Sequence, residues 1–411
     1  MKRKSLYFWF PIVFTFLVFS LSSFLLFKDL NKENNFNILF LDEKISSHFE
    51  LLKNQEKISD NVLISDDEKK YFTSCDLGVY KDYRCFAKFY EKYTKENGLE
   101  KAFSHLALLN KEFPEYLEAC HIITHGIGHA ELQNNNGDVA KSLLRVNMQN
   151  PVYKNMSTCA NGYFHGIIEE YLKDVKDETQ LLDKSRLICN ESIYDKKSLS
   201  EGGCFHGVGH ALYLQLDYDW DKSLKLCDSI TENKSDRYNC YTGVLMEDIM
   251  DSKQEEIFTH TKNDNSYEFS FKRCDSLDEI YKPACYMEAS VLFENLSENK
   301  NDYSLNISFC KYLANETYKM ACIKQMAYRA ITNLYIFPGK MCDVLENENQ
   351  KIICLATYAY RLAGSINESD EYKQKIWNDV CSYANDKKGV CLDLSKKTYI
   401  LYRTSFEDKE F

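Results

Sequence analysis

Sixteen cysteines recur along this 411-residue chain at spacings that limit its possible folds more than any other feature. Nine of them follow one another at intervals of 32 to 45 residues, with a mean of about 38, which is within the range for helix-hairpin repeats. This first series is Cys85, Cys120, Cys159, Cys204, Cys240, Cys285, Cys322, Cys354 and Cys391. The other seven each precede a member of the first series by 10 to 15 residues: Cys75, Cys189, Cys227, Cys274, Cys310, Cys342 and Cys381.

This spacing predicts a disulfide within each repeat. Segments such as DKSLKLCDSI and CYTGVLMEDIM have helical spacing of apolar residues, and polar segments separate them. We expect the earlier cysteine near the end of one helix and the later one near the start of the next, each bridge stabilising by roughly 3 kcal/mol. The predicted fold is an all-α, right-handed solenoid of about nine disulfide-stapled helix hairpins. Only 15 Gly and 5 Pro argue against a β-sandwich with its many turns.

Two repeats lack the earlier cysteine, because the equivalent positions fall near Leu108 and Met148. Their later cysteines, Cys120 and Cys159, are left over and lie in adjacent repeats. We predict that these two pair with each other, which leaves no free thiol. Spacing alone does not prove connectivity.

The N-terminus predicts the compartment. Lys2, Arg3 and Lys4 precede an uncharged stretch of 23 residues, Ser5–Phe27, which is long enough to span a bilayer. The basic flank favours a cytoplasmic N-terminus, with everything after the stretch outside, extracellular or periplasmic. A cleaved signal peptide is the alternative, but no small-x-small cleavage site follows. Many disulfides and seven Asn-x-Ser/Thr sequons agree with an exported chain in which glycosylation is possible.

Three segments follow from these patterns: a cytoplasmic tip and transmembrane signal anchor at 1–27, a polar stalk at 28–70, and an extracytoplasmic helical-repeat domain at 71–411. A formal charge of −11 argues against a basic surface that binds the phosphate backbone of nucleic acid, so nucleic acid is not an expected partner. The expected partners are the membrane, through the N-terminal helix, and a possible peptide or protein on the repeat surface.

Six of the nine histidines lie between positions 121 and 210, each near the predicted start of a second helix. Three segments carry His-Gly-x-x-His/Glu: His125 with His129, His165 with Glu169, and His206 with His210. Side chains at i and i+4 share a helical face with Cβ atoms about 5–6 Å apart, the spacing by which a helix offers two metal ligands. His121 lies one turn before His125 and could be a further ligand.

Glycines accompany these histidines, although a glycine inside a helix costs about 1 kcal/mol relative to alanine. Gly126, Gly166 and Gly207 each directly follow a histidine, and Gly128, Gly162 and Gly209 lie nearby. We expect close approach of neighbouring helices, or space for a ligand, to offset this cost. Adjacent repeats would then bring the three motifs to one surface.

The predicted metal ligands are His121, His125, His129, His165, Glu169, His206 and His210, with Glu169 or Glu170 as a catalytic base. Later repeats lack the pattern, since Thr242 and Met246 replace the paired histidines, so the ligand set is expected to end with the His206 repeat. Imidazole and carboxylate ligands suit Zn, Fe, Mn or Cu, as one ion or two. Cysteine ligation is not expected, because an oxidising compartment removes thiolates.

The architecture resembles tetratricopeptide-like helical-hairpin solenoids over residues 70–400, although consensus tetratricopeptide residues are absent. Paired metal ligands on successive hairpins are similar in arrangement to deoxyhypusine hydroxylase, a HEAT-repeat enzyme with a di-iron centre held by His-Glu pairs. This chain has His-Gly-x-x-His/Glu rather than adjacent His-Glu, and three motifs rather than four. The resemblance implies a metal site on a solenoid, but it does not imply which reaction the site would catalyse.

The preferred hypothesis is a membrane-anchored extracytoplasmic metalloprotein, a metal-dependent hydrolase or oxygenase. One alternative is a peptide- or protein-binding solenoid whose histidines are structural or hydrogen-bonded in the core. Another is a protein that captures or senses metal without turnover. Catalysis by the histidines without metal is a third alternative.

Overall fold

The computed structural model describes residues 44–48, 63–75, 83–112, 120–145, 157–189, 201–250, 274–290, 303–313, 315–331, 337–365 and 369–401. These residues form helices joined by turns and contain no strand, so the all-α prediction is confirmed. Among the residues so described, no helix has the length and apolar character needed to cross a membrane. The predicted anchor at residues 1–27 lies outside them.

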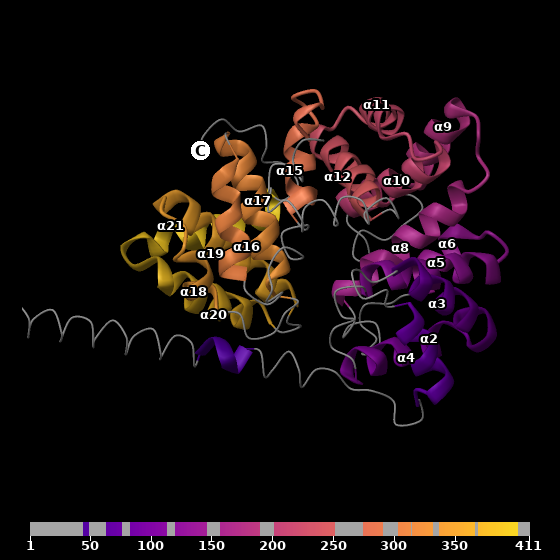
Figure 1. The fold of residues 1–411 in the computed structure, drawn as a ribbon, viewed down its shortest axis with the longest axis horizontal. Helices are drawn as coiled ribbons and strands as arrows, with labels where there is room; N and C mark the ends of the chain where they lie inside the picture. The colour runs from indigo at the N-terminus through magenta and orange to yellow at the C-terminus, as the bar shows by residue number, and fades with distance from the viewer. Residues whose placement is uncertain are drawn as a thin grey trace, which may run out of the picture.

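The helices form a curved stack that runs from α2 to α21 (Figure 1). Nine of them each pack against the next in the order given: α3 (Tyr83–Asn97), α5 (Cys120–Asn134), α8 (Ser157–Leu172), α10 (Glu201–Gln215), α12 (Lys234–Met250), α15 (Lys282–Ala289), α17 (Glu316–Arg329), α19 (Glu348–Ser365) and α21 (Lys388–Leu401). Each begins with or soon reaches a cysteine of the first series. The right-handed solenoid of about nine hairpins stays a prediction.

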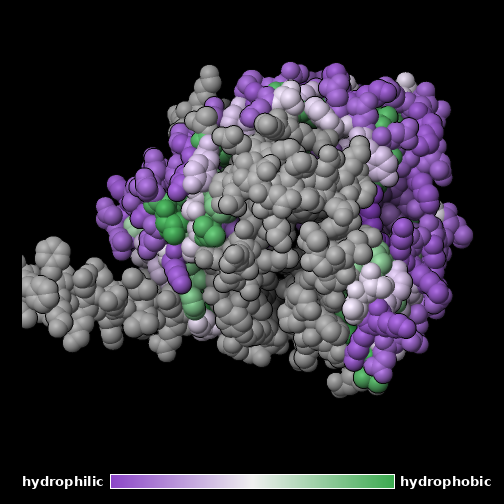
Figure 2. All heavy atoms as spheres, viewed as in Figure 1, coloured by the Kyte–Doolittle hydropathy of each residue, from purple (hydrophilic) through white to green (hydrophobic). Residues whose placement is uncertain are grey.

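The other described helices lie before or between these nine along the chain. They are α2 (Asp66–Ser74), α4 (Leu99–Glu112), α6 (Val139–Arg145), α9 (Glu178–Ile188), α11 (Trp220–Ile230), α16 (Tyr303–Ser308), α18 (Pro338–Cys342) and α20 (Asp370–Cys381), with 3-10 turns at Phe309–Tyr312 and Ser382–Lys387. Several begin at a side-chain cap: Ser65 before α2, Asp177 before α9 and Asp219 before α11 each accept a backbone N–H of the first turn. The outer rim of the stack is largely hydrophilic (Figure 2).

Seven predicted bridges are confirmed. Their pairs are Cys75–Cys85, Cys189–Cys204, Cys227–Cys240, Cys274–Cys285, Cys310–Cys322, Cys342–Cys354 and Cys381–Cys391. In two repeats the residue after the first cysteine, Asp228 or Asp275, accepts a hydrogen bond from the tyrosine after the second, Tyr241 or Tyr286. The recurring Cys-Asp dipeptide therefore ties the same turn that the disulfide closes.

Cys120 is also disulfide-bonded, but the side chain of its predicted partner Cys159 lies outside the described residues. A peptide map of the non-reduced protein is expected to contain a Cys120–Cys159 cross-linked peptide, because every other cysteine belongs to a local bridge. A map that joins Cys120 to Cys204 would overturn both this prediction and the Cys189–Cys204 bridge.

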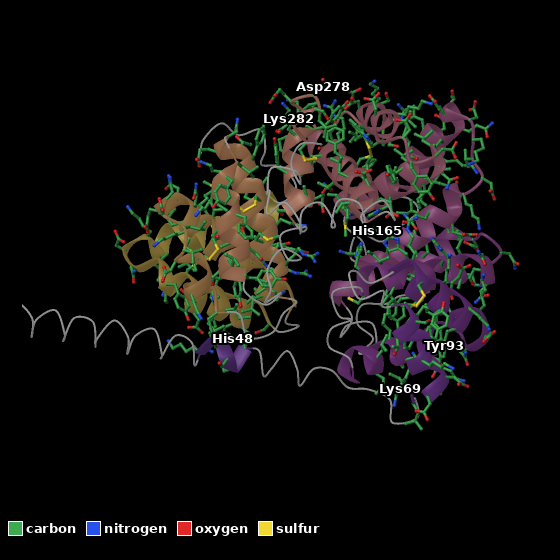
Figure 3. All side chains as sticks on the ribbon, in the orientation of Figure 1. His48, Lys69, Tyr93, His165, Asp278 and Lys282 are labelled. Carbon is green, nitrogen blue, oxygen red and sulfur yellow. A yellow bond between two sulfur atoms is a disulfide. The ribbon has the colours of Figure 1, made fainter. Side chains whose placement is uncertain are left out.

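Residues 44–48, within the segment predicted as a stalk, are helical and lie beside α20 (Figure 3). Ile45 is fully buried there. His48 Nδ1 lies 2.8 Å from the Tyr372 hydroxyl, and His48 Nε2 lies 3.0 Å from Asp379 Oδ2. This part of the N-terminal segment is therefore held against the last hairpin.

One predicted glycosylation sequon is inaccessible. Asn306 lies in α16 and has no exposed surface. Its side chain cannot accept a glycan in the folded protein, whereas the sequon at Asn233 lies at the exposed start of α12.

Candidate metal centre

The histidine motifs lie on three adjacent helices. α5 carries His121, His125 and His129, α8 carries His165 and Glu169, and α10 carries His206 and His210. Because α5 packs on α8 and α8 packs on α10, the motifs face one another. The predicted convergence of the three motifs is therefore present in the structure.

Glycines permit these helices to approach closely. A Cβ atom on Gly162 would lie 1.8 Å from the His121 carbonyl oxygen, and one on Gly166 would lie 2.1 Å from that of His125. The contact is reciprocal, since a Cβ on Gly128 would lie 2.1 Å from the Tyr163 carbonyl oxygen. These distances are far below van der Waals contact, so only glycine allows the spacing between α5 and α8. The cost of glycine within these helices is thus offset by their close packing.

Two groups of side chains could each hold a metal ion. Ligand atoms of His121, His165, His206 and His210 all lie within 4.8 Å of one another, and the same holds for Glu169, His210 and Glu247. Ring centroids in the first group lie 4.9 Å apart for His121–His165 and 4.8 Å apart for His206–His210. His210 belongs to both groups.

Carboxylates hold two of the imidazoles in a defined orientation. Glu169 Oε1 lies 2.8 Å from His125 Nδ1, and Glu247 Oε2 lies 3.0 Å from His210 Nδ1. The Nε2 atoms of His125 and His210 are buried and have no hydrogen-bond partner among the described residues. Metal-bound histidines typically have this arrangement, with one ring nitrogen held by a carboxylate and the other directed to the ion.

Three contacts of the other imidazoles also fit metal ligation. His206 Nδ1 lies 2.8 Å from the Thr242 hydroxyl, and His165 Nε2 lies 3.1 Å from the Gly203 carbonyl oxygen, to which it can donate. His165 Nδ1 lies 3.2 Å from His121 Nε2. Two nitrogens on one tetrahedral ion, with metal–nitrogen distances of about 2.0–2.1 Å, would be about 3.3 Å apart.

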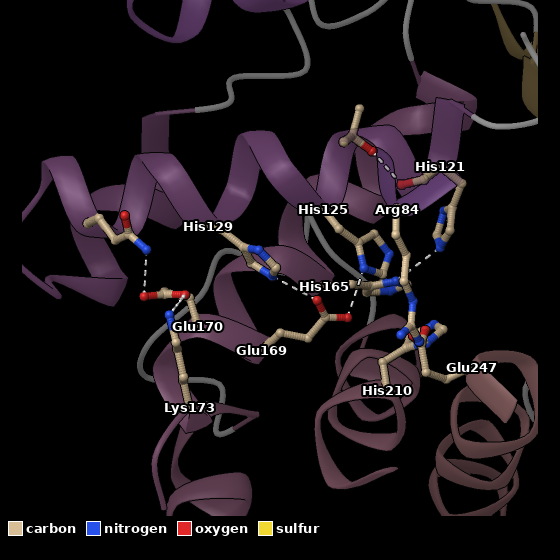
Figure 4. Close-up of polar contacts among 12 residues, drawn as sticks. Arg84, His121, His125, His129, His165, Glu169, Glu170, Lys173, His210 and Glu247 are labelled. Carbon is tan, nitrogen blue, oxygen red and sulfur yellow. Dashed lines mark hydrogen bonds and ion pairs between the residues drawn. The ribbon is translucent and has the colours of Figure 1, made fainter. Parts of the chain in front are cut away.

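His129 and the two glutamates of α8 occupy different places. His129 Nε2 hydrogen-bonds Glu169 Oε2 at 2.8 Å (Figure 4). The predicted ligands His125 and His129 belong to neither group. Glu170 accepts a hydrogen bond from Gln133 Nε2 at 2.7 Å and lies 3.4 Å from Lys173 Nζ. The predicted base function of Glu170 stays a prediction, and the contacts of Glu169 with two histidines make it the better placed of the pair.

The structure adds a candidate ligand beyond the predicted set, because Glu247 on α12 belongs to the second group. The expectation that the ligand set ends with the His206 repeat stays a prediction. Glu247 follows Met246, the residue that breaks the paired pattern. Gly209 and Gly243 bring α10 and α12 together, since a Cβ on Gly243 would lie 2.0 Å from the His206 carbonyl oxygen. This approach brings Glu247 to His210.

Sequence patterns also missed Arg84 on α3. Its Nη2 lies 2.8 Å from Glu247 Oε1, so a residue of α3, near the start of the stack, contacts α12 (Figure 4). The two residues are 163 positions apart in the sequence, and no local spacing could have indicated their contact.

Burial sets the charge of three imidazoles. It is the main cause that holds the pKa values of His121, His165 and His206 well below 6.5, and the positive charges of neighbouring histidines lower them further. These rings are therefore neutral at pH 7 and keep a lone pair for a metal.

Carboxylates reverse this effect at two other rings. Burial lowers the pKa of His129 and of His210, but the hydrogen bonds and charges of Glu169 and Glu247, respectively, outweigh it, so both pKa values lie above 6.5. Burial raises the pKa values of Glu169 and Glu247, but the facing histidines outweigh burial and both values end below 4.5.

These shifts predict acid sensitivity of the metal-free protein. His121, His165 and His206 bind protons in the unfolded state below a pH of about 6.5 but resist them when folded, so their contribution to stability falls as pH drops. His129 and His210 act in the opposite sense, because their pKa values are raised in the folded protein. Their contribution to stability is present below a pH of about 6.5 and is lost as the pH rises through the folded pKa. Glu288 also acts in the opposite sense, because burial raises the pKa of its carboxyl to about 8. In a Glu288→Gln background, which removes that opposing group, urea denaturation is expected to give a lower free energy of unfolding at about pH 5 than at about pH 7.5.

A His165→Asn variant is the control for this pH dependence and should flatten it. Equal or greater stability of the metal-free Glu288→Gln protein in acid would show that the buried rings are not held neutral.

No protein-family model, no curated protein and no solved structure matches this chain.

Proposed function

We propose that this chain is an extracytoplasmic metalloprotein whose metal centre is built from histidines and glutamates of α5, α8, α10 and α12. One observation carries the proposal. His125 and His210 each have Nδ1 against a carboxylate while Nε2 is buried without a hydrogen-bond partner in the described part of the chain. An unpaired buried polar atom costs about 1–3 kcal/mol, and an ion bound in either group would remove that cost at His210, which belongs to both groups.

The two groups of ligands support different uses. Four imidazoles would saturate a tetrahedral ion, as in closed structural sites, so occupation of the His121 group favours metal capture or storage. Glu169, His210 and Glu247 would supply three protein ligands and leave a position open, as in catalytic sites. The second arrangement supports an enzyme, a metal-dependent hydrolase or oxygenase.

Catalysis at the three-ligand group would draw on this chain's own residues. A bound divalent ion would supply Lewis-acid character and lower the pKa of a coordinated water. The lowered pKa of Glu169 keeps its carboxylate ionised and able to bind the ion, and the hydrogen bond from His129 fixes its second oxygen. Zn, Fe, Mn and Cu all suit these nitrogen and oxygen ligands.

The proposal includes the membrane anchor at 1–27, the stalk at 28–70 and a right-handed solenoid at 71–411. The uncharged stretch Ser5–Phe27 supports the anchor, and the succession of stapled hairpins supports the solenoid. Disulfides at this density indicate an oxidising extracytoplasmic compartment. A peptide or protein that binds along the repeats is a further proposal, and in that case replacement of the histidines would leave its binding intact.

Elemental analysis tests the proposal. The purified chain, stripped with chelator and reloaded separately with Zn, Fe(II), Mn and Cu, is expected to retain one or two equivalents of at least one of them after dialysis. A protein that retains no stoichiometric metal after any loading would refute the metal centre and leave the histidines as a hydrogen-bonded network.

A further inference from the structure

Arg84 links the first part of the stack to the candidate metal centre. It lies on α3, and its Nη2 lies 2.8 Å from Glu247 Oε1 on α12 (Figure 4). The Arg84 side chain is 35% exposed, whereas that of Glu247 is 11% exposed. Because the carboxylate is largely removed from water, the guanidinium acts on it more strongly than it would in a surface ion pair.

Glu247 has both carboxylate oxygens engaged. Oε1 faces Arg84, and Oε2 lies 3.0 Å from His210 Nδ1. His210 Nε2 is buried and has no hydrogen-bond partner in the described part of the chain. With Nδ1 held by the carboxylate, Nε2 is the nitrogen that His210 can offer to an ion. In this arrangement Glu247 orients a ligand and is not a ligand itself.

The two candidate ligand groups make different demands on Glu247. The first group consists of four imidazoles, so an ion bound there leaves Glu247 beside His210, where it orients the ring as an outer-shell carboxylate. The second group requires Glu247 itself as a ligand. Arg84 opposes this second use, because its positive charge already compensates the carboxylate and repels a cation beside it. The Arg84–Glu247 contact therefore favours an ion held by the imidazoles.

A strained turn holds Arg84 in this position. The Arg84 guanidinium carbon lies 5.9 Å from the Tyr218 ring centroid, and that ring packs edge-on against Tyr213 with centroids 5.5 Å apart. Tyr218 has φ of 65°, a left-handed conformation that is costly for an aromatic residue. Gly137, with φ of 79°, occupies the corresponding place in the turn after α5, and both residues donate their N–H to a carbonyl five residues earlier. Tyrosine at this place gives the guanidinium a ring contact that glycine could not.

We propose that Arg84 is a positioning residue that holds Glu247 on His210 and so directs a bound ion to the four-imidazole group rather than to the group with Glu169. Loss of the guanidinium frees Glu247 to ligate, and the ion then moves to the second group, which has an open position. With Arg84 in place, the chain holds its ion in the closed arrangement suited to capture. This inference rests on the proposed metal centre, but not on which metal the centre takes.

X-ray absorption at the edge of whichever of Zn, Fe, Mn or Cu the full chain retains tests this function of Arg84, because ring scattering counts the bound imidazoles. The wild-type spectrum is expected to fit four imidazoles, and that of Arg84→Met one, since His210 is the sole imidazole of the second group. Methionine keeps the length of the side chain and its packing on Tyr218 but removes the charge. Arg84→Lys keeps the charge and should keep the wild-type spectrum.

A second substitution separates positioning from structural support. Glu247→Gln added to Arg84→Met should restore the four-imidazole spectrum, because an uncharged amide is a poor ligand but can still accept the hydrogen bond of His210 Nδ1. A loss of imidazoles caused by a disturbed fold would not be restored in this way. Lys88→Met is the control, since it removes an exposed positive charge from the same helix and should leave the spectrum unchanged.

An unchanged imidazole count in Arg84→Met would overturn the proposal, as would a wild-type spectrum with a single imidazole. A loss that Glu247→Gln does not reverse, or an equal loss in Lys88→Met, would also overturn it. In each of these cases the metal centre itself would stand. A full chain that retains none of these metals would instead refute the centre, and this inference with it.

Discussion

Replacing His210 by asparagine is expected to weaken metal binding by more than about 100-fold, because loss of an outer-shell partner alone costs about 10- to 100-fold. His210 belongs to both candidate ligand groups, so neither can compensate. Asparagine can still donate a hydrogen bond to Glu247, which limits the loss of stability, but it has no atom in place of Nε2. Competition with a chromophoric chelator measures the affinity.

His129→Asn is the matched control for this prediction. His129 lies on the same face of α5 as His125 and contacts Glu169, but it belongs to neither ligand group. We expect its replacement to weaken metal binding by about tenfold, the lower end of the loss for an outer-shell contact. If the two variants bind metal equally well, His210 is not a ligand.

Replacing Gly162 by alanine is expected to destabilise the protein by about 3 kcal/mol or more. The new Cβ would lie 1.8 Å from the His121 carbonyl oxygen, a backbone atom that cannot move aside without shifting α5. Overpacking of this kind costs typically about 1–3 kcal/mol, and more where the backbone must move. Because the shift separates the helices that carry His121 and His165, metal affinity should fall as well. Urea denaturation of wild type and variant measures the first effect.

Gly364→Ala in α19 is the control, since a Cβ there meets nothing within 4 Å. Alanine at that position should be neutral or stabilise by up to about 1 kcal/mol, and metal affinity should not change. Equal effects of the two substitutions would show that the glycines do not set the distance between α5 and α8.

Cysteine and histidine spacing predicted much of this structure. Both patterns are local: a disulfide such as Cys227–Cys240 closes a single turn, and His206 and His210 share one helical face. The glycines beside the histidines correctly indicated close helix packing. These features depend on residues within one or two repeats, which is the range over which spacing carries information.

Residues brought in from distant repeats could not be predicted in this way. Glu247 reaches His210 because α12 packs closely on α10, and this close approach depends on Gly209 and Gly243. Arg84 on α3 reaches Glu247 on α12, although α5, α8 and α10 lie between these helices along the stack. An acidic residue in the helix after the last histidine motif was the available signal for Glu247, whereas Arg84 had none.

X-ray absorption spectroscopy of the metal-loaded protein tests the central claim most directly. We predict only nitrogen and oxygen ligands at about 2.0–2.2 Å, with the scattering pattern of several imidazoles, and the loss of at least one imidazole in His210→Asn. A spectrum dominated by sulfur at about 2.3 Å, or one in which imidazole scattering is absent, would contradict a metal centre built from these histidines.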